Sequence, residues 1–247
     1  MCFSAGASFS AAAFLAAIGF LSIKHAPKRL KFFAAIPLLF AIQQFSEGLL
    51  WILMTGLPND SKSPLSVPII ILAAPFGLLS KALSLKQYIA QIKEFTAFVF
   101  MFFALVVWPS WMPFSLAFAE ERKTRRHFLY AFVALGFGIS TILLMGMLSQ
   151  GVGVRVIAGH MVYTTPEIFT DVEFNNLLLY CMATVVPFFI SSLRGTKVLG
   201  VLIILSAALA WYAWYTAFGS VWCFFAAVIS VMVHSIIHKP RHDHELL

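Results

Sequence analysis

Long apolar runs recur along the chain and are separated by short polar segments. Each is close to the roughly 20 residues that a helix needs to cross a bilayer core about 30 Å thick. The runs cover residues 5–23, 32–54, 95–119, 128–149, 174–193, 198–217 and 218–238. The last two meet at a turn that we predict near Phe218-Gly219-Ser220. The pattern predicts one all-α domain over residues 1–247, a polytopic membrane bundle of seven transmembrane helices.

Residues 63–80 form an uncharged stretch that is a candidate eighth span, but three prolines and Gly77 interrupt it. With seven spans and the N-terminus outside, twelve Lys and Arg residues lie inside and five outside. An eighth span changes the distribution to eight inside and nine outside. Because Lys and Arg favour cytoplasmic loops, we predict a cytoplasmic C-terminus and an outside re-entrant or interfacial segment at residues 63–94.

Composition supports a membrane class and argues against a nucleic-acid partner. Apolar residues make up 61% of the chain and charged residues 11%, whereas soluble domains carry about 25% charged residues. The formal charge is +7, but the basic residues lie in short loops between apolar runs. In that position they fix orientation and attract anionic lipid. The predicted partners are therefore the bilayer and anionic lipid at the inner loops.

Small residues and prolines suggest how the helices pack. The first run is rich in Ala, Ser and Gly, so we expect it inside the bundle, where backbones approach closely. Gly136-Phe137-Gly138 is expected to be a packing notch. Pro109 and Pro113 predict a kink in the third span that leaves backbone carbonyls without helical partners.

Glu47 is the one acidic residue well inside a predicted span. A charge isolated in lipid costs several kcal/mol, so such a residue is a functional candidate. The spacing places Gln43, Gln44 and Trp51 on the same helical face as Glu47. This face must point into the bundle, where it forms either a site for a proton, metal or substrate or a structural hydrogen-bond network.

Other polar residues are predicted at a similar depth, in the outer half of the bundle: Cys2, Ser4, His160, Tyr163, Tyr180, Ser220, Trp222 and Cys223. Two cysteines, a histidine and Glu47 are a plausible ligand set for zinc or a soft metal. Cys2 and Cys223 are alternatively a redox pair. Both hypotheses require the residues to converge, and small packing residues are the simpler explanation for cysteines in membrane helices. No metal is assigned from the sequence.

His234 and His238 form an HxxxH pair near the inner end of the last span, a spacing that can hold a metal. Together with His25 and His127 they resemble the histidine set of seven-span zinc hydrolases of the alkaline ceramidase and progestin-receptor type. The match is incomplete, because Ser22 and His25 are three residues apart rather than four. Since His242 and His244 continue the run, an interfacial histidine-rich C-terminus is the simpler hypothesis.

The opening segment of residues 1–9 resembles a family of bacterial seven-span integral membrane proteins that begin with MCFSATASF and have no established activity. Gly6 stands where that family has threonine. The resemblance extends to Gln43-Gln44, Glu47-Gly48, Trp108-Pro109, Gly159-His160 and residues 220–227. It implies a seven-span fold in the bacterial inner membrane and assigns no catalytic residue.

The sequence predicts a polar site in the outer half of the bundle, centred on Glu47. Cys2 and His160 are further catalytic candidates. The binding candidates are Gln43, Gln44, Trp51, Tyr163, Tyr180, Ser220, Trp222 and Cys223. The hypotheses are a membrane-embedded enzyme or binding protein for a lipid or small molecule, a proton-coupled transporter, channel or sensor, and a structural or assembly protein. The sequence leaves enzymatic activity undecided.

Overall fold

The computed structural model describes residues 4–55, 82–164 and 173–238, and this part of the chain is mostly helical. The helices and strands are α1 (Ala5–His25), η1 (Lys28–Leu30), α2 (Lys31–Ala34), α3 (Ile36–Thr55), α5 (Ala82–Phe102), η2 (Phe103–Val107), α6 (Trp108–Ala119), α7 (Lys123–Gln150), β1 (Gly153–Ile157), β2 (His160–Thr164), α8 (Glu173–Ile190), α9 (Thr196–Ala213), η4 (Tyr215–Ala217), α10 (Phe218–Ile229) and α11 (Met232–His238).

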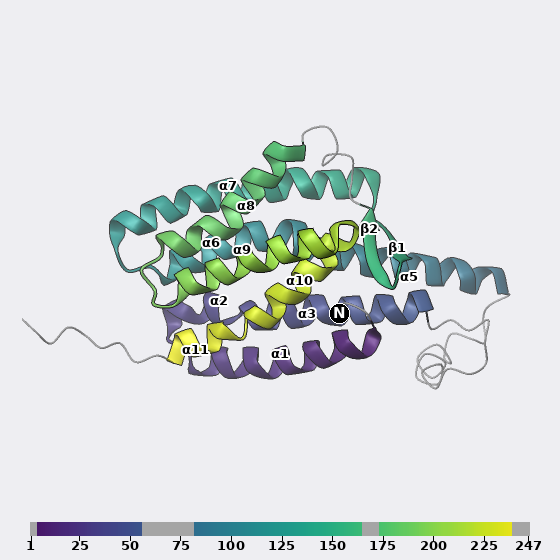
Figure 1. The fold of residues 1–247 in the computed structure, drawn as a ribbon, viewed down its shortest axis with the longest axis horizontal. Helices are drawn as coiled ribbons and strands as arrows, with labels where there is room; N and C mark the ends of the chain where they lie inside the picture. Colours follow the sequence, from purple (N-terminus) through teal and green to yellow (C-terminus); the bar gives the residue numbers. More distant parts are fainter. Residues whose placement is uncertain (1–3, 56–81, 165–172, 239–247) are drawn as a thin grey trace, which may run out of the picture.

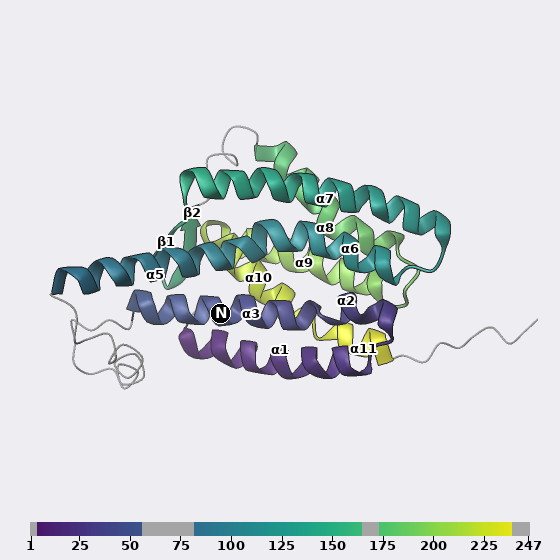
Figure 2. The same ribbon diagram turned by 180° about the vertical axis from the view of Figure 1, so that it is seen from behind.

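The long helices lie side by side along one axis (Figures 1 and 2). Ser4 caps α1, because its hydroxyl accepts from the Ala7 backbone N–H at 3.2 Å. Helices α1 and α3 form an antiparallel pair in which a Cβ on Gly19 would lie 2.7 Å from the Leu38 nitrogen. The small residues therefore allow close contact, as predicted. However, α1 lies at the edge of the bundle rather than inside it, since Phe14 is 56% and Phe20 65% exposed.

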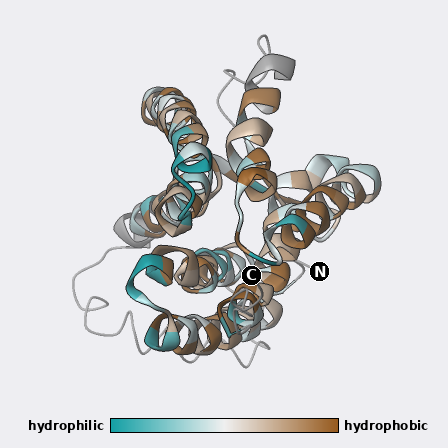
Figure 3. Ribbon diagram, turned by 90° about the vertical axis from the view of Figure 1, so that its left-hand side faces the viewer, coloured by the Kyte–Doolittle hydropathy of each residue, from teal (hydrophilic) through white to brown (hydrophobic). Residues whose placement is uncertain are grey.

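The outward surfaces of the helices are apolar. Exposed side chains on α7 and α9 include Phe128, Phe137, Met145, Val201 and Leu205. Hydrophobic residues, in brown, recur on helices throughout the bundle in Figure 3. Six described helical segments are long and apolar enough to cross a membrane, and the apolar part of α8, Leu178–Ile190, is shorter. An exposed apolar surface of this extent indicates a membrane protein.

Several predicted boundaries shift in the structure. The turn before the last span lies at Trp214 and η4 instead of at residues 218–220, where α10 has already begun. The last predicted span divides into α10 and α11 around Ser230. Residues 63–81, the larger part of the outside segment expected at residues 63–94, lie outside the described residues, whereas α5 continues from Ala82 into the third predicted span.

The third predicted span has an irregular centre, as its prolines suggested. A π-helical turn, η2, lies between α5 and α6, directly before Trp108-Pro109. Hydroxyl groups from neighbouring helices donate to its carbonyls, Tyr180 of α8 to Ala104 at 2.6 Å and Ser140 of α7 to Val106 at 2.8 Å. These bonds satisfy polar backbone atoms that lipid cannot satisfy, so the irregular turn is fixed by its neighbours.

A β-hairpin between α7 and α8 makes the all-α prediction incomplete. Strands β1 and β2 pair antiparallel, with Ile157 opposite His160. Ala158 and Gly159 form the turn with φ angles of 49° and 76°. A two-residue turn with both φ values positive matches the right-handed twist of a hairpin. The hairpin packs against α10 and η4 through β2 and against α5 through β1.

The ends of α1, α6, α8 and α11 lie together at the opposite end of the bundle from the hairpin (Figure 1). Arg29 pairs with Glu121 there. The buried Glu120 carboxylate accepts from the Arg122 backbone at 3.0 Å and from the Ser192 backbone and hydroxyl, each at 2.6 Å. The three described basic loops that the sequence predicts to be inside, at residues 24–31, 122–126 and 194–197, therefore share one end of the molecule.

The surroundings of the Glu120 carboxyl lead us to expect a measurable loss of protein stability in acid. Burial acts to raise the pKa of the Glu120 carboxyl, but hydrogen bonds from Ser192 and Arg122 and the nearby Arg125 charge outweigh it, so the pKa lies below the ordinary 4.5. A lowered folded-state pKa stabilises the protein above the unfolded value, and this contribution is lost as pH falls below about 4.5. We expect Glu120→Gln to be less stable at neutral pH.

The difference between the thermal midpoints of wild type and Glu120→Gln in detergent should shrink as pH falls through the acid range. The exposed Glu94→Gln, in helix α5, is the matched control and should track the wild type. A difference between Glu120→Gln and wild type that is constant with pH would contradict the proposed electrostatic role of Glu120.

Candidate functional site

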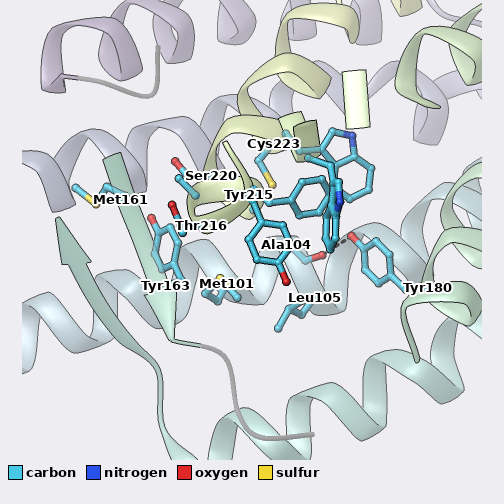
Figure 4. A pocket seen from close by; sticks show the side chains of 15 residues that line it. Met101, Ala104, Leu105, Met161, Tyr163, Tyr180, Tyr215, Thr216, Ser220 and Cys223 are labelled. Atoms are coloured by element: carbon cyan, nitrogen blue, oxygen red, sulfur yellow. Dashed lines mark hydrogen bonds between the residues drawn. The ribbon is translucent and has the colours of Figure 1, made fainter. Parts of the chain in front are cut away.

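A cavity of about 420 Å³ lies at the hairpin end of the bundle. Strand β2, helix α8, the π-helical region and the segment from the end of α9 to the start of α10 enclose it (Figure 4). Its wall is formed by Met101, Ala104, Leu105, Met161, Tyr163, Tyr180, Trp211, Tyr215, Thr216, Ala217, Phe218, Gly219, Ser220, Trp222 and Cys223. The wall is mainly apolar and aromatic, with a few hydroxyl groups and one thiol.

Ser220 connects the cavity to Glu47. Its side chain lines the wall, and its hydroxyl donates to Oε1 of Glu47. Glu47 is itself fully buried in α3. The first turn of α10 therefore separates the carboxylate from the cavity, and the Ser220 hydroxyl is the polar group between them. The carboxylate lies behind the cavity wall rather than in it.

Gln43 is the centre of a hydrogen-bond network one turn before Glu47. Its Oε1 accepts from the Trp108 indole N–H at 2.8 Å, and its Nε2 donates to the Phe100 carbonyl and to the Cys223 sulfur, each at 3.4 Å. These contacts join α3 to α5, α6 and α10. Cys223 also lines the cavity, so the network fixes part of the cavity wall.

Gln44 and Trp51 lie on the buried face of α3, as predicted. Neither the Gln44 amide nor the Trp51 indole N–H bonds to another side chain or backbone group in the described ranges. The second Glu47 carboxylate oxygen, Oε2, likewise accepts no hydrogen bond from the described residues. Because an unpaired buried polar group costs about 1–3 kcal/mol, this face requires polar partners such as water or residues outside those ranges.

Aromatic residues shape the sides of the cavity. The Tyr163 ring stacks on Phe100 with centroids 4.6 Å apart, and the Trp222 ring stacks on Phe218 at 5.3 Å. Tyr180 lies edge-on to Trp222 at 6.2 Å, while its hydroxyl is held by Ala104. The cavity is therefore bounded by packed rings whose positions are fixed by neighbouring elements.

The structure separates part of the predicted site. It places Tyr163, Tyr180, Ser220, Trp222 and Cys223 on the cavity wall, whereas His160, at the start of β2, lies beside Trp214 with ring centroids 6.4 Å apart. Partial burial lowers the pKa of the His160 imidazole.

The metal and disulfide hypotheses receive no support from the described residues. Cys2 lies outside them, so its pairing with Cys223 stays a prediction. Within residues 4–55, 82–164 and 173–238, no three His, Cys, Asp or Glu side chains are placed to hold a metal ion. Without Cys2, the proposed metal ligands therefore do not form a centre.

Several cavity residues are not among the site residues predicted from the sequence. They are Met101, Ala104, Leu105, Met161, Trp211, Tyr215, Thr216, Ala217 and Phe218. The aromatic segment at residues 211–218 was a usable signal, because Trp and Tyr gather where a membrane helix reaches the interface. The two β-rich runs around Ala158-Gly159 were a second signal, for the hairpin. The apolar residues of α5 and η2 carried no signal, since any buried helix has such residues.

Comparison with known proteins identifies a family but no activity. The sequence model of a family of unknown function, DUF6629, matches residues 95–245. This range includes the cavity-lining residues but not Glu47 or the opening motif. No curated protein and no solved structure matches the chain.

Proposed function

The chain belongs to the family of unknown function DUF6629, and we propose that it is a membrane protein that binds a lipid or another small amphipathic molecule in the cavity at the hairpin end. The observation that carries this proposal is the position of Ser220, which lines the cavity and whose hydroxyl bonds to the buried Glu47. The proposal is for binding, and it assigns no reaction.

The size and lining of the cavity support a small-molecule ligand. Its volume of about 420 Å³ lies within the roughly 300–1,000 Å³ of known ligand sites. Such sites combine apolar and aromatic walls with a few polar groups that orient the ligand. Here the rings of Tyr163, Trp211 and Trp222 offer an apolar surface, and the exposed Thr216 offers a hydroxyl group. An amphipathic ligand matches both parts of the wall.

The buried Glu47 carboxylate fixes one of the polar groups of the cavity wall. The Ser220 hydroxyl donates its single proton to Glu47, so the direction of this hydroxyl on the cavity wall is fixed. Thr216, on the same wall, is exposed, and its hydroxyl is the group that we propose the polar part of a ligand contacts. Glu47 is a positioning residue in this proposal, and Gln43 holds Cys223 on the same wall.

The membrane orientation proposed here follows the charge distribution. We propose seven crossings, with the N-terminus and the cavity toward the outer face of the bacterial inner membrane and the basic loops toward the cytoplasm. The common position of the basic loops at one end supports this orientation, because Lys and Arg are retained on the cytoplasmic side. Anionic lipid headgroups are the proposed partners of these loops.

Replacing Gly219 with a residue whose side chain fills the cavity tests the binding proposal. A Cβ on Gly219 would meet no atom within 4 Å, and Gly219 lies on the cavity wall. Gly219→Leu should therefore occupy the cavity without a clash in the protein. We expect lipid retention to fall at least about tenfold, since the bulky side chain takes the volume that a ligand needs. Native mass spectrometry after extraction from phosphatidylethanolamine and phosphatidylglycerol vesicles measures retained lipid.

Gly138→Leu is the matched control, because Gly138 is exposed on α7 and also has no atom within 4 Å of a Cβ. It should retain lipid as the wild type does. Equal retention by wild type and Gly219→Leu would reject the cavity as the binding site.

Proton flux in liposomes that disappears in Glu47→Gln, with no retained lipid, would instead support the transporter hypothesis. Thermal destabilisation of Glu47→Gln alone would support the structural hypothesis.

A further inference from the structure

Three histidines gather where the end of α1 meets α11, at the opposite end of the bundle from the cavity (Figure 1). His25 is the last residue of α1, and His238 is the last residue of α11. Their ring centroids are 5.5 Å apart, and the His234 ring lies 4.2 Å from that of His238. The sequence pattern showed the HxxxH pair but not its contact with α1.

The hydrogen bonds determine which ring nitrogen of His25 and His238 is free. The Nδ1 of His25 bonds to the Leu21 carbonyl at 2.8 Å, and that of His238 to the His234 carbonyl at 2.9 Å. A carbonyl oxygen can only accept, so Nδ1 carries the proton in both rings. In the neutral imidazole the Nε2 lone pair is then available. Metal-binding histidines usually have this arrangement, with the other nitrogen donating to a carbonyl or carboxylate.

Ser22 and His234 hold the two helices together beside this pair. The Ser22 hydroxyl donates to the Ile18 carbonyl at 2.7 Å, which uses its only proton. Its 3.0 Å contact with Nδ1 of His234 is therefore a bond that His234 donates and Ser22 accepts. Ser22 is fully buried, so the bond fixes α11 against α1. This contact holds α11 beside the end of α1, where the ring centroids of His25 and His238 lie 5.5 Å apart.

We propose that His25 and His238 bind a divalent transition-metal ion such as Zn²⁺ and thereby link α1 to α11, the first and last helices of the described residues. A tetrahedral zinc at about 2.0–2.1 Å from each Nε2 places the two ring centroids about 5 Å apart. The separation of 5.5 Å fits this geometry. The 4.2 Å between His234 and His238 is too short for both to bind one ion in this way. Since no third His, Cys, Asp or Glu in the described ranges completes the site, water supplies the remaining ligands.

Both proposed ligands are exposed, so an ion can reach them from the aqueous phase. Binding to the folded state alone raises stability by mass action. The bound metal ion joins α1 to α11, the first and last described helices. Loss of the ion should leave the cavity at the other end of the bundle intact. The metal proposal and the proposed ligand cavity therefore fail or succeed independently.

Thermal unfolding of the full chain in detergent, purified without a histidine tag, tests the proposal. With ZnCl₂ at about a hundredfold excess over the dissociation constant, we expect the midpoint to rise by about 5 °C or more relative to EDTA. The rise should disappear in His25→Ala and in His238→Ala, whose exposed positions leave the fold intact. Ser22→Ala should weaken zinc binding without removing a ligand.

A variant with both His242→Ala and His244→Ala is the control for the C-terminal residues outside the described ranges, and it should respond to zinc as the wild type does. Isothermal titration with ZnCl₂ should give one ion per chain in the wild type and in this control. No zinc response in the wild type would overturn the proposal. A response retained in His25→Ala and His238→Ala, or lost in the control, would also overturn it.

Discussion

Replacing Gly136 with alanine should destabilise the protein by about 3 kcal/mol, at the upper end of the usual cost of overpacking. Gly136 lies on the face of α7 that contacts α6, and an added Cβ would overlap the Pro109 carbonyl oxygen and lie 2.8 Å from the Pro109 carbonyl carbon. The obstacle is backbone, so no side-chain rotation relieves it. The two helices must separate, and the contacts around the π-helical turn weaken with them.

Gly138→Ala provides the comparison within the same helix. Its Cβ would meet no atom within 4 Å, so the substitution adds helix propensity without a clash and should stabilise by about 0.5–1 kcal/mol. Reversible unfolding of both variants in mixed micelles gives the free energies. Equal effects at the two positions would show that α6 and α7 do not approach as closely as the structure indicates.

Replacing Gln43 with leucine should cost about 2–3 kcal/mol of unfolding free energy. Leucine keeps most of the volume but leaves the Trp108 indole N–H without the acceptor that now lies at 2.8 Å. Trp108 is 4% exposed, so water cannot easily replace the lost partner. An unsatisfied buried donor costs about 1–3 kcal/mol, and the contacts to Phe100 and Cys223 are lost as well.

A double-mutant cycle with Trp108→Phe separates the hydrogen bond from the other contacts. Phenylalanine retains a ring that can stack on Phe40, whose centroid lies 3.9 Å from that of Trp108. The double variant should be more stable than the sum of the single effects predicts, by about 1–2 kcal/mol, because both polar partners are removed together. Additive effects, within about 0.5 kcal/mol, would show that the two side chains are not coupled.

The sequence by itself determined the class of the molecule and most of its helices. Apolar runs near 20 residues long can be read locally, because bilayer thickness fixes the required length. The same holds for the buried face of Gln43, Gln44 and Glu47, since polar groups on one side of an apolar helix must turn away from lipid. The irregular third span was also predictable, because proline removes a helical hydrogen bond wherever it occurs.

Only the tertiary structure decided which residues share a site. The contact between Ser220 and Glu47 joins positions 173 residues apart, and no local pattern encodes that distance. The edge position of α1 depends on how many neighbours surround it, which its small residues do not specify. The meeting of His25 with His238 likewise follows from the close packing of α1 and α11. Periodicity fixes which face of a helix is buried, but only the packing of all helices fixes what that face meets.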